Sequence, residues 1–192
     1  NSTEGVFARL TLPGYHFSNR IGYPELPQIH NLIELPQGAE PRVEIEHEDF
    51  EIINLKDYGI EDPLFPRQPS LSKSQSPLDV PFEWNQNIYY INDFIGEETV
   101  SIQDKGTLRS MRIANLIVRP VNYNPVTNEI KVITDLQISI HFDGADIAET
   151  ERLKTQYYSP YFEANYHQIK NYQTPELRDD LVNYPLSYLI VT

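Results

Sequence analysis

The clearest signal along this chain is the alternation of apolar and polar residues over its first 145 positions. Residues 6–12 alternate in this way, and Val43 and Ile45 alternate with glutamates that would face water. A period of two residues is typical of a strand that packs one face against a core. We therefore expect strands in both places.

The most regular unit runs from Ile113 to Phe142. An apolar run over 113–119 leads through Pro120 to a polar turn segment at 124–128, and alternation resumes in two stretches after it. Alternating strands joined by short turns indicate an antiparallel meander with one buried face. Repeated short strands with proline and glycine turns favour a mainly β fold, an antiparallel, jelly-roll-like β-sandwich.

Near the C-terminal end the pattern changes to one that is typical of short helices. Asp146 can cap a helix that continues to about Lys154. Ser159 and Pro160 fit an N-cap and a first helical position, and apolar residues at helical spacing extend this helix to about Lys170. The sandwich is thus expected to carry one or two short C-terminal helices.

These patterns predict three parts of the chain. Residues 1–170 form the sandwich domain with its terminal helices, and the polar, proline-containing residues 171–186 form a linker. The continuous apolar run at 187–192 is typical of a buried parallel strand. We expect it to be the first strand of a downstream α/β domain, and a last strand of the same sandwich is the alternative.

Composition and charge disfavour several classes of partner and chemistry. The 192 residues include 15 basic and 28 acidic side chains, and the net charge of −13 disfavours nucleic acid and anionic membranes as partners. The chain has no cysteine, so it has no disulfide, thiolate nucleophile or zinc–thiolate site. No apolar run approaches the roughly 18 residues of a membrane-spanning helix.

No catalytic or metal-binding motif stands out. The histidines form no His-x-His or His-Glu-x-x-His pattern, and Gly-x-Ser-x-Gly is absent. Residues 46–49 are rich in metal-ligand types, but neighbours on a strand point to opposite faces. Asp143 and Asp146 could ligate calcium, although the twelve-residue calcium-loop pattern is missing. We expect a non-catalytic chain without a cofactor, and calcium is the alternative.

One loop is unusual for so acidic a chain. Residues 63–78, the basic loop, contain Arg67 and Lys73 but no acid, and four prolines keep the stretch extended and out of regular structure. Lys73 lies between Ser72 and Ser74, so no neighbour along the chain offers it a salt bridge. An extended segment with one unpaired lysine looks like a protease substrate, and an ordinary surface loop is the plain alternative.

Eight short segments in chain order point to one family. They are Gly22–Pro27, Leu32–Ala39, Gln68–Ser74, Val80–Phe82, Gly106–Ala114, Tyr123–Thr127, Phe142–Asp146 and Ser159–Glu163. Together they resemble the N-terminal propeptides of the gingipain-type cysteine peptidases, particularly the lysine-specific branch. The resemblance covers most of the chain.

The resemblance implies a secreted or cell-surface bacterial precursor. Its propeptide would be a β-sandwich that assists folding of the cysteine peptidase and blocks its active site. In such propeptides a basic residue on an extended loop enters the acidic S1 pocket. The position that looks equivalent is Lys73, with Leu71, Ser72 and Ser74 beside it in the inhibitory loop. The implied partner is the catalytic domain of the same precursor chain.

Four basic residues compete with Lys73 for this role, and they are Arg67, Lys105, Arg109 and Arg112. Prolines near Arg67 on both sides stiffen that position. Arg109 and Arg112 adjoin the apolar run that begins at Ile113, so we expect them to pair with the acidic surface.

Processing by cleavage is also implied by the resemblance. The lysine-specific relative is processed at an arginine soon after its last helix, where this chain has Asn171. We choose the bond after Arg178 as the processing site, and Lys170 is the other nearby basic residue. Residues 189–191 resemble the first strand of the family's catalytic domain.

A second hypothesis is a free-standing secreted β-sandwich that binds carbohydrate or protein. Trp84, the sole tryptophan, would then serve as a stacking platform. The alternative role for Trp84, which follows directly after the basic loop, is to anchor the base of that loop in the core. Only the propeptide hypothesis requires Lys73.

Overall fold

The computed structural model describes residues 5–76 and 80–175. Its strands are β1 (His16–Phe17), β2 (Pro27–Leu35), β3 (Glu40–Asn54), β4 (Val100–Leu108), β5 (Met111–Val118), β6 (Val121–Asn124) and β7 (Glu129–Asp143). The helices are α1 (Gln86–Tyr89), α2 (Ile147–Tyr157) and α3 (Glu163–Tyr166), with 3-10 turns η1 (Leu55–Tyr58) and η3 (Pro160–Phe162). Within these residues, no helix is long and apolar enough to cross a membrane.

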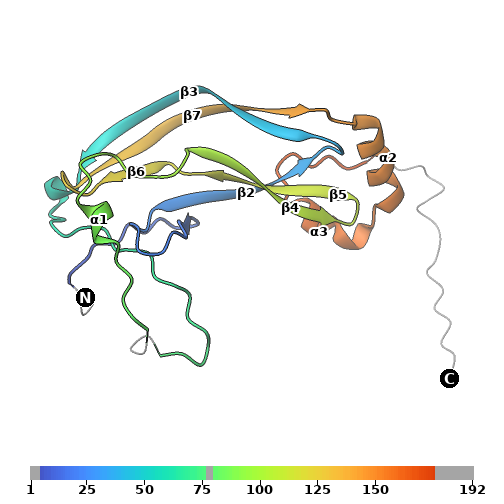
Figure 1. The fold of residues 1–192 in the computed structure, drawn as a ribbon. Coiled ribbons are helices and arrows are strands. Elements are labelled where there is room, and N and C mark those ends of the chain that lie inside the picture. The colour runs from blue at the N-terminus through green and yellow to red at the C-terminus, as the bar shows by residue number, and fades with distance from the viewer. Residues whose placement is uncertain (1–4, 77–79, 176–192) are drawn as a thin grey trace. The chain divides into compact units, whose positions relative to one another are not determined.

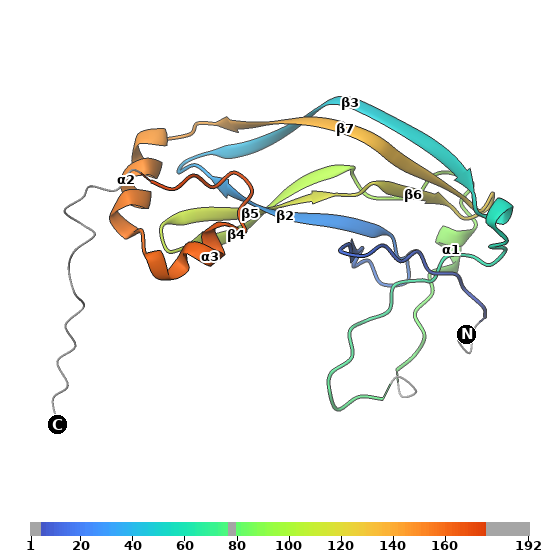
Figure 2. The same ribbon diagram turned by 180° about the vertical axis from the view of Figure 1, so that it is seen from behind.

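The strands form two sheets. One has the order β1-β2-β5-β4 and the other the order β3-β7-β6. The pairs β1–β2 and β6–β7 are antiparallel, and β3 runs beside β7 in both views (Figure 1, Figure 2). The prediction of a mainly β, antiparallel sandwich with short C-terminal helices is confirmed.

The predicted meander is wrong in one respect, because β5 and β6 belong to different sheets. The chain changes sheet at Arg119 and Pro120. The N–H of Arg119 donates to the carbonyl of Thr99, next to β4, whereas the carbonyl of Pro120 accepts from the N–H of Ile133 on β7. Proline has no N–H to continue the ladder of β5, so it suits the point where a strand changes partners.

The strand expected over residues 6–12 is also absent from the structure. Ala8 forms only an isolated parallel bridge with Leu64, supported by hydrogen bonds from Ala8 N–H to Pro63 O and from Phe65 N–H to Ala8 O. The segment packs beside 63–65 without joining either sheet, and Val6 and Leu12 at the ends of the alternating stretch are exposed.

The contacts divide the chain into two compact units. Unit 1 lies within residues 1–31, 42–103 and 115–141, and unit 2 within 32–41, 104–114 and 142–192. The buried core of unit 1 consists of Leu26, Leu55, Leu64, Val121, Tyr123 and Ile130. The hydroxyl of Tyr123 donates to Asn128 Oδ1 at 2.8 Å, so the largest fully buried side chain has its polar atom satisfied.

In unit 2 the core centres on Met111, Tyr166 and Ile169. Asp146 caps α2 as predicted, since its carboxylate accepts the N–H of Glu149 at 2.9 Å. The next helix ends at Tyr166 and not near Lys170. The reason is a competing partner: the N–H of Lys170 donates to the carbonyl of Leu32 on β2 at 2.8 Å.

Candidate functional site

Lys73 lies on the surface of unit 1, in the long excursion of the chain between β3 and α1 (Figure 1, Figure 2). Its ammonium group has no hydrogen bond or ion pair with any residue within 5–76 or 80–175. Leu71, Ser72 and Ser74 beside it are exposed as well. The residues that the sequence singled out are therefore presented to solvent together.

The tip of the basic loop is a tight turn and not the extended stretch that the prolines predicted. The N–H of Gln75 donates to the carbonyl of Ser72 at 3.1 Å, and the Gln75 side chain accepts the Ser72 N–H at 3.0 Å. The hydroxyls of Ser72 and Ser74 lie 3.2 Å apart. Short polar side chains fold the backbone back in this way because they offer it local hydrogen bonds.

The three rival arginines are engaged within the protein. Arg67 donates to Glu25 at 2.5 Å, and Arg112 donates to the carbonyls of Pro36 and Ala39 at 3.1 and 3.0 Å. Arg112 also pairs with an acid of the same unit, Asp104, at 3.0 Å, as expected for a strand residue. Arg109 donates to the carbonyl of Tyr157 at 2.9 Å, and its guanidinium lies 5.0 Å from the ring centroid of Phe162.

A buried carboxylate stands at the base of the loop. The Glu25 side chain is only 8% exposed, with Arg67 on one side and Arg9 at 3.6 Å on the other. Arg9 in turn lies over the ring of Phe65 at 3.8 Å. Two guanidinium groups thus compensate the cost of burying one carboxylate, and they tie Arg67 to the body of unit 1.

Gln68 joins the two limbs of the loop, which are residues 66–68 before the tip and residues 83–85 after it. Its side-chain amide donates to the carbonyl of Glu83 at 2.8 Å and accepts the N–H of Glu83 at 3.0 Å. A further hydrogen bond runs from the same amide nitrogen to the carbonyl of Pro66 at 2.9 Å. A glutamine side chain therefore bonds to the backbone as a neighbouring strand would.

Gly22 contacts the same two limbs with its backbone. Its N–H donates to the carbonyl of Arg67 at 2.8 Å, and its carbonyl accepts the N–H of Asn85 at 3.1 Å. Gly22 has φ of 78°, and a Cβ at this position would lie 3.1 Å from the Asn85 nitrogen. A glycine is required here for both reasons.

Aromatic rings complete the base of the loop. Trp84 packs edge-on against Phe7 and Tyr89, with centroids 5.3 and 5.8 Å apart, and Phe82 lies 5.8 Å from Phe65. Trp84 thus packs at the base of the loop as predicted, although it is half-buried and does not belong to the buried core. The sequence alone did not single out Glu25, Gln68 or Gly22 for this role, although all three lie in segments quoted for the family resemblance.

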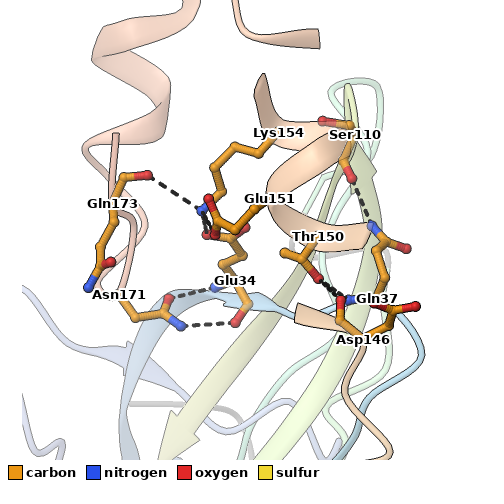
Figure 3. Close-up of polar contacts among 9 residues, drawn as sticks. All are labelled: Glu34, Gln37, Ser110, Asp146, Thr150, Glu151, Lys154, Asn171 and Gln173. Atoms are coloured by element: carbon orange, nitrogen blue, oxygen red, sulfur yellow. Dashed lines mark hydrogen bonds and ion pairs between the residues drawn. The ribbon is translucent and has the colours of Figure 1, made fainter. Parts of the chain in front are cut away.

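Unit 2 holds a second polar cluster, centred on Glu34 and Lys154 (Figure 3). Lys154 Nζ lies 2.8 Å from the Glu34 carboxylate, and the two side chains are 6% and 7% exposed. Lys154 also lies 3.7 Å from Glu151 and 3.4 Å from the carbonyl of Gln173. Burial raises the pKa of Glu34, and the nearby Lys154 ammonium offsets this only in part.

Asn171 ties the chain beyond α3 to β2. Its side chain accepts the N–H of Glu34 at 2.7 Å and donates to the carbonyl of Glu34 at 2.9 Å (Figure 3). Lys170 is exposed just before it. Arg178, the predicted processing residue, and the apolar run 187–192 lie outside the described residues.

Among the described residues, one group of three histidine or acidic side chains lies close enough together to share a metal ion. The carboxylate of Asp146 is engaged as the cap of α2, and calcium binding beside Asp143 stays a prediction. His47 and Asp49 share a face of β3, and Asp135 of β7 joins them, with all three exposed. His47 Nε2 lies 3.2 Å from Asp49, which is the geometry of a surface ion pair.

Comparisons with known proteins agree over nearly the whole chain. The family model Propeptide_C25 matches residues 1–166. Lys-gingipain of Porphyromonas gingivalis is 39% identical over 187 residues, which is 97% of this chain but only 11% of that protein. Gingipain R2 of the same species is 25% identical over 119 residues, 62% of this chain and 15% of the relative. The chain thus spans a small part of the relatives it matches.

Solved structures give the same answer. One, on the zymogenic latency of gingipain K from P. gingivalis, has a TM-score of 0.70 at 38% identity and covers 75% of this chain and 79% of that one. The complex of the P. gingivalis RgpB pro- and mature domains has a TM-score of 0.62 at 20% identity, with coverages of 75% and 71%, and it shows likeness of fold alone. This chain therefore belongs to the Propeptide_C25 family and is a propeptide segment, not a peptidase.

Proposed function

We propose that this chain is the inhibitory and folding-assisting propeptide of a secreted bacterial cysteine endopeptidase zymogen, and that Lys73 blocks the active site by entering an acidic S1 pocket. The partner is the catalytic domain of the same precursor, exported with it. The relatives that support this are Lys-gingipain, at 39% identity, and the 38% identical structure concerned with zymogenic latency.

The presentation of Lys73 carries the proposal. An ammonium group that leaves water for a pocket must be paired there, because an unpaired buried charge costs several kcal/mol. A partner within the propeptide would compete with the pocket, and the described residues offer Lys73 none. Arg67, Arg109 and Arg112, by contrast, already have partners that they would have to give up.

The turn at Ser72–Gln75 supports inhibition without rapid cleavage. Peptidases bind the residues around the scissile bond as an extended strand. The bond after Lys73 lies inside a hydrogen-bonded turn, so cleavage there requires the turn to open. Lys73 can fill a pocket while the following peptide bond stays out of line for attack.

Release of the propeptide completes the proposal. We assign the processing cut to the bond after Arg178, with Lys170 as the other basic candidate. Until that cut, the shared chain keeps the inhibitor at a high effective concentration, so modest intrinsic affinity suffices for latency.

The test uses the purified chain and mature Lys-gingipain of P. gingivalis as the probe peptidase. The wild-type chain is expected to inhibit, and Lys73→Ala to weaken inhibition at least about 30-fold, as for a central anchor residue. Lys56→Ala, which removes another exposed lysine of unit 1, serves as the matched control and should inhibit normally. Equal inhibition by Lys73→Ala and wild type would refute the role of Lys73.

A further inference from the structure

The amide of Gln68 replaces a strand partner at the point where the basic loop leaves unit 1. Its oxygen and nitrogen pair with the N–H and carbonyl of a single residue, Glu83, at 3.0 and 2.8 Å. Gly22 joins the same limbs nearer the body of unit 1, through Arg67 on the first limb and Asn85 on the second. The contacts of Gln68 with Glu83 lie one residue closer to the tip on the first limb and two residues closer on the second. Gln68 therefore fixes the distance between the two limbs at a point nearer the tip than Gly22 does.

The half-buried Gln68 has the chemistry that this position needs. A side-chain amide offers a donor and an acceptor side by side in one plane, and a glutamine reaches further than an asparagine. The amide nitrogen of Gln68 also donates to the carbonyl of Pro66 at 2.9 Å, and this hydrogen bond within the first limb fixes the orientation of the amide. The described hydrogen bonds of the tip, between Ser72 and Gln75, are local and do not set the direction of the limbs.

We propose that Gln68 is a positioning residue: by joining the two limbs of the basic loop, it presets the direction in which Lys73 is presented to the peptidase. The inference rests on the proposed role of Lys73 and adds to it a residue that touches neither the pocket nor the reacting atoms. Gln68 acts on the propeptide before binding, by raising the fraction of molecules whose loop is already in the competent arrangement.

This mechanism has a kinetic signature. When only a fraction of the molecules is competent to bind, the apparent affinity falls by that fraction, and the loss appears in the association rate. A residue that contacts the partner directly changes mainly the dissociation rate. Loss of the two hydrogen bonds that join Gln68 to Glu83 predicts an association rate about tenfold lower for Gln68→Met, with an unchanged dissociation rate.

The experiment measures the binding rates of the full chain to mature Lys-gingipain whose catalytic cysteine is replaced by alanine, by surface plasmon resonance. Wild type, Gln68→Met, Lys73→Ala and the double variant form a cycle. Because Gln68 acts through Lys73, Gln68→Met is expected to slow association in the wild-type background and to have no effect in the Lys73→Ala background. Amide hydrogen exchange of Glu83 should become faster in Gln68→Met.

Gln168→Ala, a change to an exposed glutamine of unit 2, is the control and should leave both rates unchanged. An unchanged association rate for Gln68→Met, with Lys73→Ala still strongly impaired, would overturn the positioning role and leave the proposed function intact. A faster dissociation that persists in the Lys73→Ala background would also overturn it, because Gln68 would then contact the peptidase. Normal binding by Lys73→Ala would instead contradict the proposed function itself.

Discussion

Lys154 and Glu34 form an ion pair of 2.8 Å that is almost completely removed from solvent (Figure 3). Lys154 comes from α2 and Glu34 from β2, so the pair joins this helix to the strand within unit 2. A buried pair contributes little by its mere presence, because desolvation offsets attraction, but removing one partner leaves the other charge uncompensated.

We therefore expect Lys154→Met to lower the free energy of unfolding by about 3 kcal/mol at neutral pH. The double variant with Glu34→Gln should be more stable than the sum of the two single changes predicts, because it removes both charges together. Urea denaturation measures this cycle. Arg152→Met, on the exposed face of the same helix, is the control and should change stability little. Additive effects would mean that Glu34 and Lys154 do not depend on each other.

The raised pKa of Glu34 predicts a specific dependence on pH. The folded state binds this proton more tightly than the unfolded state, so the contribution of Glu34 to stability is greatest below its ordinary pKa of 4.5. That contribution is lost as the pH rises through the raised pKa. The stability of wild type relative to Glu34→Gln should thus increase as the pH falls from 7 to 4, as followed by urea midpoints. The opposite trend would show that attraction to Lys154 outweighs burial.

Gly22 should be intolerant of a side chain, and Gly59 provides the matched comparison. Both have φ near +75°, at 78° and 74°, but a Cβ on Gly59 meets nothing within 4 Å. Gly59→Ala is expected to cost about 1–2 kcal/mol from backbone strain alone. Gly22→Ala adds the close approach to Asn85 and should lower the melting temperature further. Equal melting temperatures would mean that the contact between Gly22 and Asn85 relaxes without cost.

The tip turn should protect the bond after Lys73 from cleavage. Gln75→Ala removes the side-chain hydrogen bond to Ser72 N–H and lets the tip extend more often. Trypsin should then cut after Lys73 several-fold faster than in wild type, because the lost hydrogen bond stabilised the closed turn by roughly 1 kcal/mol. Mass spectrometry of the cleavage products measures the two rates. Cleavage after Lys56 in the same sample is the internal control and should be unaffected. A uniform rise at both sites would point to global destabilisation instead.

Local features of the fold could be predicted from the sequence because they depend on near neighbours. The alternation along β3 and β7 follows from one face being buried, and the cap of α2 follows from Asp146 alone. The length of the last helix could not be predicted, because Lys170 bonds to Leu32, a residue far away in the sequence. Lys73 could be singled out by its neighbours and by resemblance, whereas its support by Gln68 and Glu83 could not.

The sequence by itself determined that this is an acidic, cysteine-free, mainly β chain with a basic loop, since composition and period depend only on residue types and their order. Only the tertiary structure decided which strands share a sheet, that the chain changes sheet at Pro120, and that Arg67, Arg109 and Arg112 are engaged while Lys73 is exposed. The physical reason is that hydrogen bonds and ion pairs between distant residues leave no periodic pattern. Their partners become defined only when the backbone brings them within about 3 Å.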